Sequence, residues 1–428
     1  MKVLIMGGGI IGVTTAYYLA LGGDNVTVID RQRGVALETS FANAGLVSPG
    51  HSYSWASPRA PGILLRSLVS KGQPLRLRLR TDWRGYTWCW QFLRNCTSER
   101  AYRNTSIKAR LSRYSQEQLA SLTSRENLCY EQNDGGLLYL YRDNESFENG
   151  VARSTVLTEG GLKLERLDRA ATIAREPALA DSRNDLAGSI YCPSDATGDA
   201  HLFTKAVSAC CTRLGVTFMF NTQVLGISGD AAQVDYVETT GGRMSADCYV
   251  LALGSYSPQL ARRLGYRLPV YPVKGYSMTF PIPNGAHAPA IGGVDEAHLL
   301  AWARFGTRLR ITAGAEFAGY NSRFAPGDFD PMRRAVRELF PHSADYSQPT
   351  YWAGLRPMTP EGTPYIGRTR HHNLFFNTGH GHLGWTWSCG TARLLADIMH
   401  SRVPEIDLTG LTLATKNAQG ARLYGSPR

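Results

Sequence analysis

The sequence contains no CxxC pair and no spacing of cysteine and histidine that is typical of a metal site. Its eight cysteines, including the neighbours Cys210 and Cys211, are expected to be reduced and mostly buried, which indicates a reducing compartment, the cytoplasm. Internal repeats and low-complexity tails are also missing, and no segment after the first strand-like stretch is apolar enough to span a bilayer. These absences argue against a disulfide-stapled secreted domain, a zinc module and a repeat array.

Positively charged residues are in excess. The 428 residues carry a net charge of +11, although hydrophobic residues at 43% and charged residues at 19% are ordinary for a globular protein. The basic residues do not form a nucleic-acid recognition motif, so no nucleic-acid partner is expected. An anionic substrate or an anionic membrane surface explains the balance equally well.

The densest basic segment alternates arginine with leucine and is followed by aromatic residues. One interpretation is a half-buried strand. The other is a surface that touches membrane headgroups, with aromatic anchors beside cations, which would place a cytoplasmic protein peripherally on the inner membrane. The residues concerned are Lys71, Leu75, Arg76, Leu77, Arg78, Leu79, Arg80, Trp83, Arg84, Tyr86, Trp88, Trp90 and Phe92.

The N-terminus carries a dinucleotide-binding pattern in its full context. A strand-like segment leads into Gly7, Gly9 and Gly12, a helical stretch follows, and a second strand ends on Asp30. The glycines permit a tight turn and a close approach to a pyrophosphate, and Asp30 can accept a ribose hydroxyl. A signal peptide or membrane helix is the alternative for this uncharged stretch, but the glycine run and the short basic region disfavour it.

Hydrophobic periodicity predicts further elements along the chain. Strands are expected at 137–141, 216–220, 245–254, 270–280, 308–312 and 374–379, and helices at 88–123, 151–160, 200–214, 331–339 and 385–400. Nucleotide-binding features recur at 7–30, 40–45, 221–254 and 374–390, as though one long cofactor crossed the fold. FAD is such a cofactor, and it performs hydride chemistry itself.

The fold class is therefore predicted as α/β, with a Rossmann-like FAD-binding domain and an interleaved substrate domain built on an antiparallel sheet. The FAD-binding domain is expected to be discontinuous, because its strands lie far apart in the sequence. The expected boundaries are 1–50, 150–264 and 351–428 for the FAD-binding domain, and 51–149 and 265–350 for the substrate domain.

Two further segments have the composition of a binding site. A glycine-rich loop at 378–384 precedes the last helix, where backbone N–H groups and the helix dipole favour an anion such as a reduced flavin. Arg356 lies in a rigid Gly/Pro frame, and a guanidinium can grip a carboxylate with two parallel hydrogen bonds. The alternatives are that the loop at 378–384 has no binding role and that Arg356 only stabilises the local structure.

Several of these motifs together resemble the bacterial D-amino-acid dehydrogenases, specifically their small subunit. These enzymes belong to the flavoprotein family of D-amino-acid oxidase, glycine oxidase and sarcosine oxidase. The resemblance extends from Met1 to about Val403 and is carried by residues 7–12, 39–45, 48–50, 271–276, 354–364 and 377–386.

The resemblance implies oxidative deamination of a D-amino acid to a 2-oxo acid and ammonia, with electrons passed to a quinone-type acceptor. It places the carboxylate-binding arginine at Arg356, and Tyr276 and Tyr256 are candidates for closing the pocket. Hydride transfer from Cα to flavin N5 needs no general base on carbon, which agrees with the lack of a Ser/His/Asp or paired-carboxylate set. Sarcosine oxidases have a flavin-linking cysteine where Gly354 stands, so FAD is expected to be non-covalent.

The candidate cofactor residues combine the motifs with the resemblance, and no metal is expected. They are Val3, Gly7, Gly9, Ile10, Ile11, Gly12, Asp30, Arg31, Ser40, Asn43, Ala44, Gly45, Val224, Gly254, Gly381, His382, Leu383 and Gly384.

The chain departs from the resembled enzymes at residues 294–308, where Trp302 stands in place of a smaller residue. If Trp302 faces the pocket, a secondary or cyclic amino acid such as D-proline, hydroxyproline or sarcosine stays open as the substrate. A non-catalytic FAD-binding subunit of a larger complex is the third hypothesis.

Overall fold

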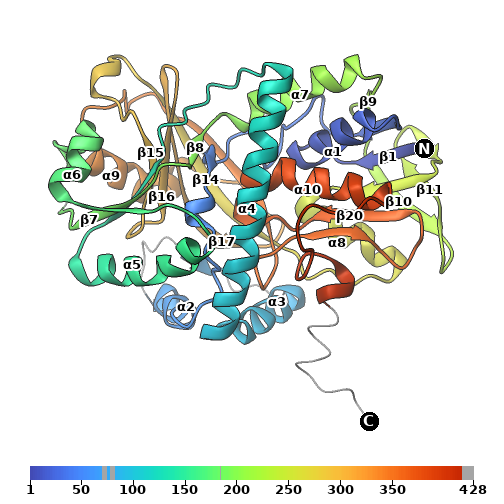
Figure 1. The fold of residues 1–428 in the computed structure, drawn as a ribbon, viewed down its shortest axis with the longest axis horizontal. Coiled ribbons are helices and arrows are strands. Elements are labelled where there is room, and N and C mark those ends of the chain that lie inside the picture. The colour runs from blue at the N-terminus through green and yellow to red at the C-terminus, as the bar shows by residue number, and fades with distance from the viewer. Residues whose placement is uncertain (70–74, 78–81, 184, 417–428) are drawn as a thin grey trace, which may run out of the picture.

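The computed structural model describes residues 1–69, 75–77, 82–183 and 185–416. Two lobes lie side by side, and the long helix α4 (Ser98–Glu126) crosses the region between them (Figure 1). One lobe surrounds a six-stranded sheet and the other a nine-stranded sheet. Mixed helix and sheet in this arrangement agree with the predicted α/β class.

The six-stranded sheet is mainly parallel and has the order β19-β20-β13-β1-β2-β9. Strand β1 lies between one strand that is near to it in the sequence and one that is far away. Val3 pairs with Val26 on one side and with Cys248 on the other. Its strands are β1 (Lys2–Met6), β2 (Asn25–Ile29), β9 (Thr217–Met219), β13 (Cys248–Leu251), β19 (Tyr365–Arg368) and β20 (Leu374–Thr378).

The N-terminal turn forms as its glycines predict. Gly7 has φ = 114°, which a side chain would strain, and a Cβ at Gly12 would overlap the carbonyl oxygen of Gly7. Helix α1 (Ile10–Leu21) consequently packs directly against β1, and it is covered by α7 (Ala200–Arg213) and α10 (Gly384–Met399).

The nine-stranded sheet forms the other lobe. Its path is β18-β14-β17-β16-β15-β5-β7-β6, with β4 pairing to β17. The pairings are antiparallel except those of β15 with β5 and β4 with β17. The strands are β4 (Leu75–Leu77), β5 (Leu137–Tyr141), β6 (Glu165–Asp168), β7 (Gly188–Cys192), β14 (Tyr271–Pro281), β15 (Gly292–Asp295), β16 (Leu300–Phe305), β17 (Arg308–Phe317) and β18 (Thr350–Met358).

Two small sheets and the remaining helices complete the described part of the chain. The small sheets contain β3 (Leu46–Val47) with β8 (Ala196–Thr197), and β10 (Val224–Gly229), β11 (Val234–Thr239) and β12 (Gly242–Met244). The helices not yet named are α2 (Ala60–Val69), α3 (Trp83–Arg94), α5 (Asn144–Glu159), α6 (Arg169–Arg175), α8 (Ser257–Ala261) and α9 (Asp330–Leu339).

Several elements belong to a different lobe from the one that the expected domain boundaries assign to them. Strands β6 and β7 fall within 150–264, yet they belong to the nine-stranded sheet. Helix α4 falls within 51–149, yet it packs on α10 in the core of the six-stranded lobe. The division into an FAD-binding and a substrate domain itself remains a prediction.

Two described side chains from the basic and aromatic segment at 71–92 make contacts within the protein. Arg76 pairs with Asp328 at 3.6 Å, and Trp88 is buried. Lys71, Leu79, Arg78 and Arg80 lie outside the described residues, whereas Trp83, Arg84 and Trp90 are exposed. In the part of the chain that the structure describes, no helix is both long and apolar enough for a membrane crossing.

Candidate active site

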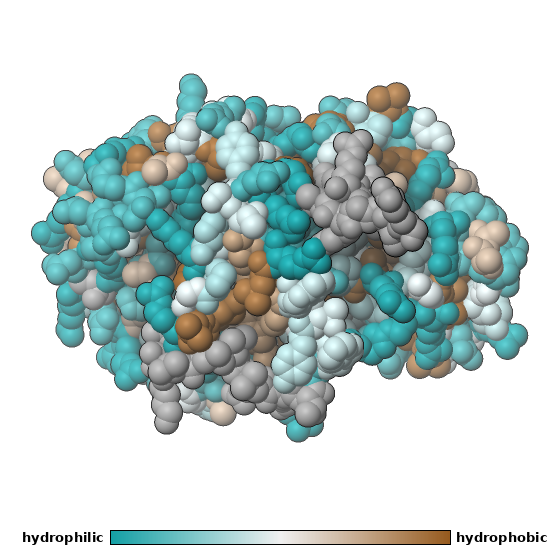
Figure 2. Space-filling model, turned by 90° about the horizontal axis from the view of Figure 1, so that it is seen from below, coloured by the Kyte–Doolittle hydropathy of each residue, from teal (hydrophilic) through white to brown (hydrophobic). Residues whose placement is uncertain are grey.

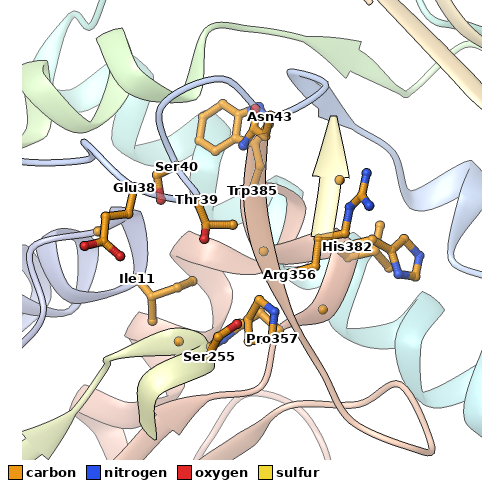
Figure 3. A pocket seen from close by; sticks show the side chains of 18 of the residues that line it. Ile11, Glu38, Thr39, Ser40, Asn43, Ser255, Arg356, Pro357, His382 and Trp385 are labelled. Carbon is orange, nitrogen blue, oxygen red and sulfur yellow. The ribbon is translucent and has the colours of Figure 1, made fainter. Parts of the chain in front are cut away.

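A cavity of about 710 Å³ lies where the two lobes meet. It falls within the usual range for small-molecule and cofactor sites, roughly 300–1,000 Å³. Segments from Gly7 to Trp385 line it, so residues almost four hundred positions apart meet around one space. Figure 3 shows Ile11 and Glu38 towards one end of this space, and Arg356 and His382 towards the other.

The end near β2 is organised by Asp30. Its carboxylate accepts hydrogen bonds from the backbone N–H of Gly8 and of Gln32, each at 2.7 Å. Burial raises the pKa of Asp30, although both backbone donors oppose the shift. The acid therefore braces the glycine turn and still borders the cavity, where a ribose hydroxyl would meet it.

The N-terminus of α1 borders the cavity through Gly9, Ile10 and Ile11. Ser40 accepts a hydrogen bond from the N–H of Ile10 at 3.2 Å, and a Cβ built at Gly9 would meet only the Ser40 hydroxyl within 4 Å, at 3.5 Å. The glycine turn thus leaves room beside a helix N-terminus, which suits a pyrophosphate.

The wall of the cavity contains buried polar atoms that the protein itself does not satisfy. His382 Nε2 and Trp385 Nε1 have no hydrogen-bond partner among the described residues, and both side chains line the cavity. Buried polar atoms are rarely left unpaired, so a bound polar group is expected there. The cradle and these atoms together fit a long dinucleotide such as FAD.

Arg356 supplies the positive charge of the other end. It lies on β18 and donates a hydrogen bond to the carbonyl of Gly314 at 2.7 Å, and no carboxylate pairs with it among the residues that the structure describes. Burial alone lowers the pKa of Arg356 to about 10. A guanidinium that is partly removed from water and lacks a counter-ion is unfavourable, and an anionic ligand would compensate its charge.

Gly275 makes room for this guanidinium. It pairs with Gly354 across β14 and β18 and lies at an irregularity in the β14–β17 register. A Cβ at Gly275 would overlap the guanidinium of Arg356, and one at Gly354 would overlap the ring of Trp352. The two facing glycines therefore leave space on the surface of the sheet, and the side chain of Arg356 lies across this space.

Gly275→Ala is expected to displace Arg356 while leaving the cofactor end intact. Overpacking of this kind typically costs about 1–3 kcal/mol, so kcat/KM should fall by about tenfold or more, mainly through KM. Steady-state kinetics at equal FAD content would measure the effect. Gly62→Ala is the matched control, because a Cβ there meets nothing within 4 Å; equal kinetics in both variants would contradict this account.

Two further side chains, His382 and Lys108, set the charge near Arg356. Burial, together with the charges of Lys108, His51 and Arg356, holds the pKa of His382 well below its usual value. Lys108 is fully buried with its Nζ directed at the carbonyl of Tyr53, and burial lowers its pKa to about 7. His382 is consequently a neutral acceptor at neutral pH.

The structure brings most of the predicted site residues to the cavity wall. Val3 and Gly12 do not line it: Val3 is buried inside β1, and Gly12 packs α1 onto the turn. The predicted residues that do line it are Gly7, Gly9, Ile10, Ile11, Asp30, Arg31, Ser40, Asn43, Ala44, Gly45, Val224, Gly254, Tyr256, Tyr276, Arg356, Gly381, His382, Leu383 and Gly384. Their roles remain predictions.

The two tyrosines occupy different ends. Tyr256 lies under the guanidinium of Arg31, 4.2 Å from the ring centroid, so it belongs to the dinucleotide end. Tyr276 lies on β14, and its hydroxyl donates a hydrogen bond to Glu316, which also pairs with Lys274 at 3.2 Å. Tyr276 therefore presents its ring, rather than a free hydroxyl, as a candidate wall of the substrate end.

Trp302 does not face the cavity. It is fully buried, donates its Nε1 hydrogen to the carbonyl of Ile291 at 2.8 Å, and packs edge-on against Phe340. The cavity is instead lined at this strand by Ala301 and, on the preceding turn, Leu299. The sequence departure at Trp302 is accordingly a packing feature of the nine-stranded lobe.

Sequence reasoning missed a polar group on the cavity wall. His51 contacts Glu296 at 2.5 Å, and Arg153 lies 3.6 Å from the other oxygen of that carboxylate. The three residues come from segments that are distant in the chain, and all three line the cavity. No spacing in the sequence signals such a group.

Comparison with known proteins places the chain among flavoproteins. Residues 2–398 match the family model described as FAD dependent oxidoreductase. The D-amino acid dehydrogenase of Granulibacter bethesdensis is 45% identical over 414 residues, covering 97% of this chain and 99% of that protein. That of Methylobacterium radiotolerans is 46% identical over 414 residues, covering 96% and 99%. A crystal structure of glycine oxidase from Geobacillus kaustophilus shares the fold, with a TM-score of 0.73, 24% identity, and coverage of 96% of this chain and 98% of that one.

Proposed function

The chain belongs to the family of FAD-dependent oxidoreductases, and we propose that it oxidises D-amino acids to imino acids, which water converts to 2-oxo acids and ammonia. The relatives named above are D-amino acid dehydrogenases, and this chain matches them over nearly their whole length. The cavity also has the features that this reaction requires. The enzyme is thus an FAD-dependent amino-acid dehydrogenase.

The observation that carries this proposal is the half-buried guanidinium of Arg356, which borders the cavity and has no carboxylate partner among the described residues. All amino acids share an α-carboxylate, and a planar guanidinium binds a carboxylate through two parallel hydrogen bonds. Gly275 and Gly314 hold Arg356 in place without neutralising it. The substrate carboxylate would supply the missing counter-charge and would fix one end of the molecule.

Other residues of the chain complete the site around the amine and Cα. When bound, FAD provides the acceptor for the hydride that leaves Cα. His382 offers a neutral imidazole nitrogen that can accept a hydrogen bond from the substrate amine, and the nearby cations disfavour an ammonium. Tyr276 and Leu299 border the space with apolar surface that excludes water.

We propose that FAD lies along the cradle from Asp30 to the loop at 378–384 and is bound without a covalent link. A cysteine at position 354 would be needed for the linkage expected in sarcosine oxidases, and a Cβ there would overlap Trp352. The discontinuous FAD-binding and substrate domains predicted from sequence are part of this proposal, with β6 and β7 joined to the substrate side.

A D-amino acid should bleach the yellow flavin of the purified protein under anaerobic conditions. Because the relatives that are 45% and 46% identical are D-amino acid dehydrogenases, we expect D-alanine to reduce the flavin much faster than sarcosine, D-proline or L-alanine. Stopped-flow absorbance measures the rates. Faster reduction by sarcosine or D-proline would favour a secondary-amine oxidase, and no reduction by the whole panel would indicate a non-catalytic FAD-binding subunit.

We further propose a quinone-type electron acceptor and a cytoplasmic protein attached peripherally to the inner membrane. The net charge of +11 and the exposed aromatic residues Trp83 and Trp90, beside Arg84, support this location. The membrane face differs from the one expected from sequence, because Arg76 is engaged by Asp328 and Trp88 is buried.

A further inference from the structure

We propose that His51 and Glu296 form a proton-accepting pair on the cavity wall, which takes one proton from the substrate ammonium and leads it to the surface beside Arg153. This inference rests on the proposed function and deepens it. His51 is assigned as a catalytic residue, and Glu296 and Arg153 are assigned as positioning residues.

A proton has to leave the cavity before the hydride does. A free amino acid carries an ammonium group at neutral pH, and hydride transfer from Cα needs a neutral amine. The N–H bond breaks first, its electron pair stays on nitrogen, and the proton passes to His51. The hydride then leaves Cα for the flavin with the electron pair of the C–H bond, while the nitrogen lone pair forms the C=N bond. The substrate thereby loses one proton and one hydride.

Three histidines line the cavity in the described part of the chain, and two of them cannot hold a proton near neutral pH. Burial lowers the pKa of His380 to about 3, and burial together with nearby cations holds the pKa of His382 well below its usual value. The buried Lys108 donates to the carbonyl of Tyr53 and is not among the residues of the cavity wall. His51 is the histidine that is left.

A carboxylate prepares His51 for this role. Nε2 of His51 lies 2.5 Å from an oxygen of Glu296, and its ring stacks on that of Tyr139 with centroids 5.0 Å apart. Burial alone would raise the pKa of Glu296, but the charge and hydrogen bond of His51 and the charge of Arg153 outweigh burial and lower it. A fixed carboxylate orients an imidazole and stabilises the imidazolium, and with Nε2 engaged, Nδ1 is the nitrogen that can receive the proton.

The chain places His51 near the proposed reaction centre. His51 lies four residues before Trp55, whose ring stacks on that of His382 with centroids 4.8 Å apart. The charges of His51 and Arg356 both act on His382, and Figure 3 shows Arg356 and His382 towards the same end of the cavity. A substrate held by its carboxylate at Arg356 would therefore have its ammonium in the part of the cavity that His51 borders.

The pair reaches the surface at Arg153 on α5. The guanidinium of Arg153 lies 3.6 Å from the second oxygen of Glu296 and 4.2 Å from the centroid of the Tyr53 ring. Arg153 lines the cavity although 42% of its side chain is exposed, and Leu299, in the same turn as Glu296, lines it and is 45% exposed. The cavity wall meets solvent here, so a proton received by His51 can pass through Glu296 to water.

Another part of the wall is unsuited to a proton. Helices α2 and α3 contribute Ile63, Leu64, Trp88 and Phe92 to the cavity. Figure 2 shows hydrophobic side chains gathered on the face where Figure 1 places these helices. A charged group would lose its hydration on such a surface, so the polar group at His51 is the side by which a proton would leave.

Other titratable groups are packed around His51, and they limit how its pH dependence can be measured. Burial raises the pKa of Tyr53 and Tyr139, which therefore stay neutral. Burial also raises the pKa of Asp195, which accepts the hydroxyl hydrogen of Tyr139, to about 6, and it lowers that of Lys108 to about 7. Wild type and variants share these groups, so a difference between their pH profiles reports on His51 and Glu296.

His51→Gln tests the pair through the pH dependence of flavin reduction. Glutamine can still hydrogen-bond to Glu296 but has no basic nitrogen. Anaerobic reduction by saturating D-alanine should be about tenfold or more slower than in the wild type at about pH 7. The difference should shrink to about twofold or less at about pH 10, where much of the free D-alanine is already a neutral amine. An equal loss at both pH values, or no loss, would overturn the proposal.

Two further variants make the result specific. Glu296→Gln keeps an acceptor for His51 but removes the charge, so it should show the same pH-dependent loss in smaller size. His372→Gln is the matched control, because His372 is exposed in the turn before β20 and does not line the cavity. Its pH profile should equal that of the wild type. A pH-dependent loss in the control, or its absence in Glu296→Gln, would contradict the assignment of the pair.

Binding of propionate separates a lost proton acceptor from a damaged cavity. Propionate has the carboxylate but no amine, so its Kd, measured from the flavin spectrum, should agree within about twofold between wild type and His51→Gln. Weaker binding in the variant would indicate a structural role and overturn the proposal. Wild-type bleaching by D-alanine reports separately on the proposed function: no bleaching at either pH would refute that function, whereas normal bleaching with parallel pH profiles would refute only the proton-accepting pair.

Discussion

Arg356→Ala is expected to lower kcat/KM for D-alanine by about two to four orders of magnitude. The variant leaves the substrate carboxylate without its counter-ion, and the loss of one partner of a buried ion pair costs about 3–5 kcal/mol. Arg356→Lys should recover only part of this loss, because an ammonium lacks the planar fork. Anaerobic flavin reduction over a range of D-alanine concentrations separates binding from hydride transfer.

The control for this variant is Arg368→Ala. Arg368 is exposed on β19 and donates to the carbonyl of Ile398 at 2.9 Å, so it probes the loss of an arginine away from the cavity. FAD content should be normal in both variants. Unchanged kcat/KM in Arg356→Ala at normal FAD content would reject the carboxylate assignment. Because burial disfavours the charged form of Arg356, the alanine variant should also be no less stable as apoprotein.

Gly9→Val should give a folded but colourless protein. A Cβ at Gly9 would make only an ordinary contact with the Ser40 hydroxyl, so the valine methyl groups would occupy the region assigned to the pyrophosphate instead of disturbing the chain. We expect FAD affinity to fall by about a hundredfold or more, equivalent to about 2.7 kcal/mol. The ratio of flavin to protein absorbance measures the loss, and circular dichroism checks the fold.

Two comparisons make this result specific. Gly241→Val places the same side chain on a β-turn where the nearest heavy atom is 3.7 Å away, and it should retain FAD. Gly12→Val should instead damage the fold, because a Cβ there overlaps the Gly7 carbonyl. Acid precipitation of the wild-type protein should release its flavin into the supernatant; flavin retained in the pellet would contradict the non-covalent interpretation.

Features that depend on neighbouring residues could be predicted from the sequence. The turn at Gly7, the helix after it and the strand ending before Asp30 follow from local sterics and hydrophobic pattern, and the structure confirms them. The helix boundaries near residue 90 were less accurate. The predicted single helix at 88–123 is two helices, with α3 capped by Asp82, whose carboxylate accepts the N–H of Arg84. An aspartate before an apolar helical stripe was the available signal.

Features that depend on the third dimension could not be predicted. The phase of β16 determines whether Trp302 or Ala301 faces the cavity, and both choices satisfy a period of two. Gly275 and Arg356 meet only because β14 and β18 pair in one register, so their overlap has no counterpart in either local sequence. The sequence predicted an aromatic surface in the segment at 71–92 as one of two interpretations, but it did not separate the buried Trp88 from the exposed Trp83 and Trp90.

The placement of β1 between β2 and β13, with β20 beyond, has a consequence for synthesis of the chain in the cell. A ribosome adds roughly 5–20 residues per second, so roughly 20–70 s separate the emergence of Asp30 from that of Trp385. Early in this interval β1 has no β13 to pair with, β13 in turn has no β20 until residue 378 has emerged, and the wall of the cavity is incomplete throughout. FAD can therefore be captured only near the end of translation, and a nascent chain stalled before residue 374 would expose the apolar edges of an unfinished sheet to chaperones and proteases.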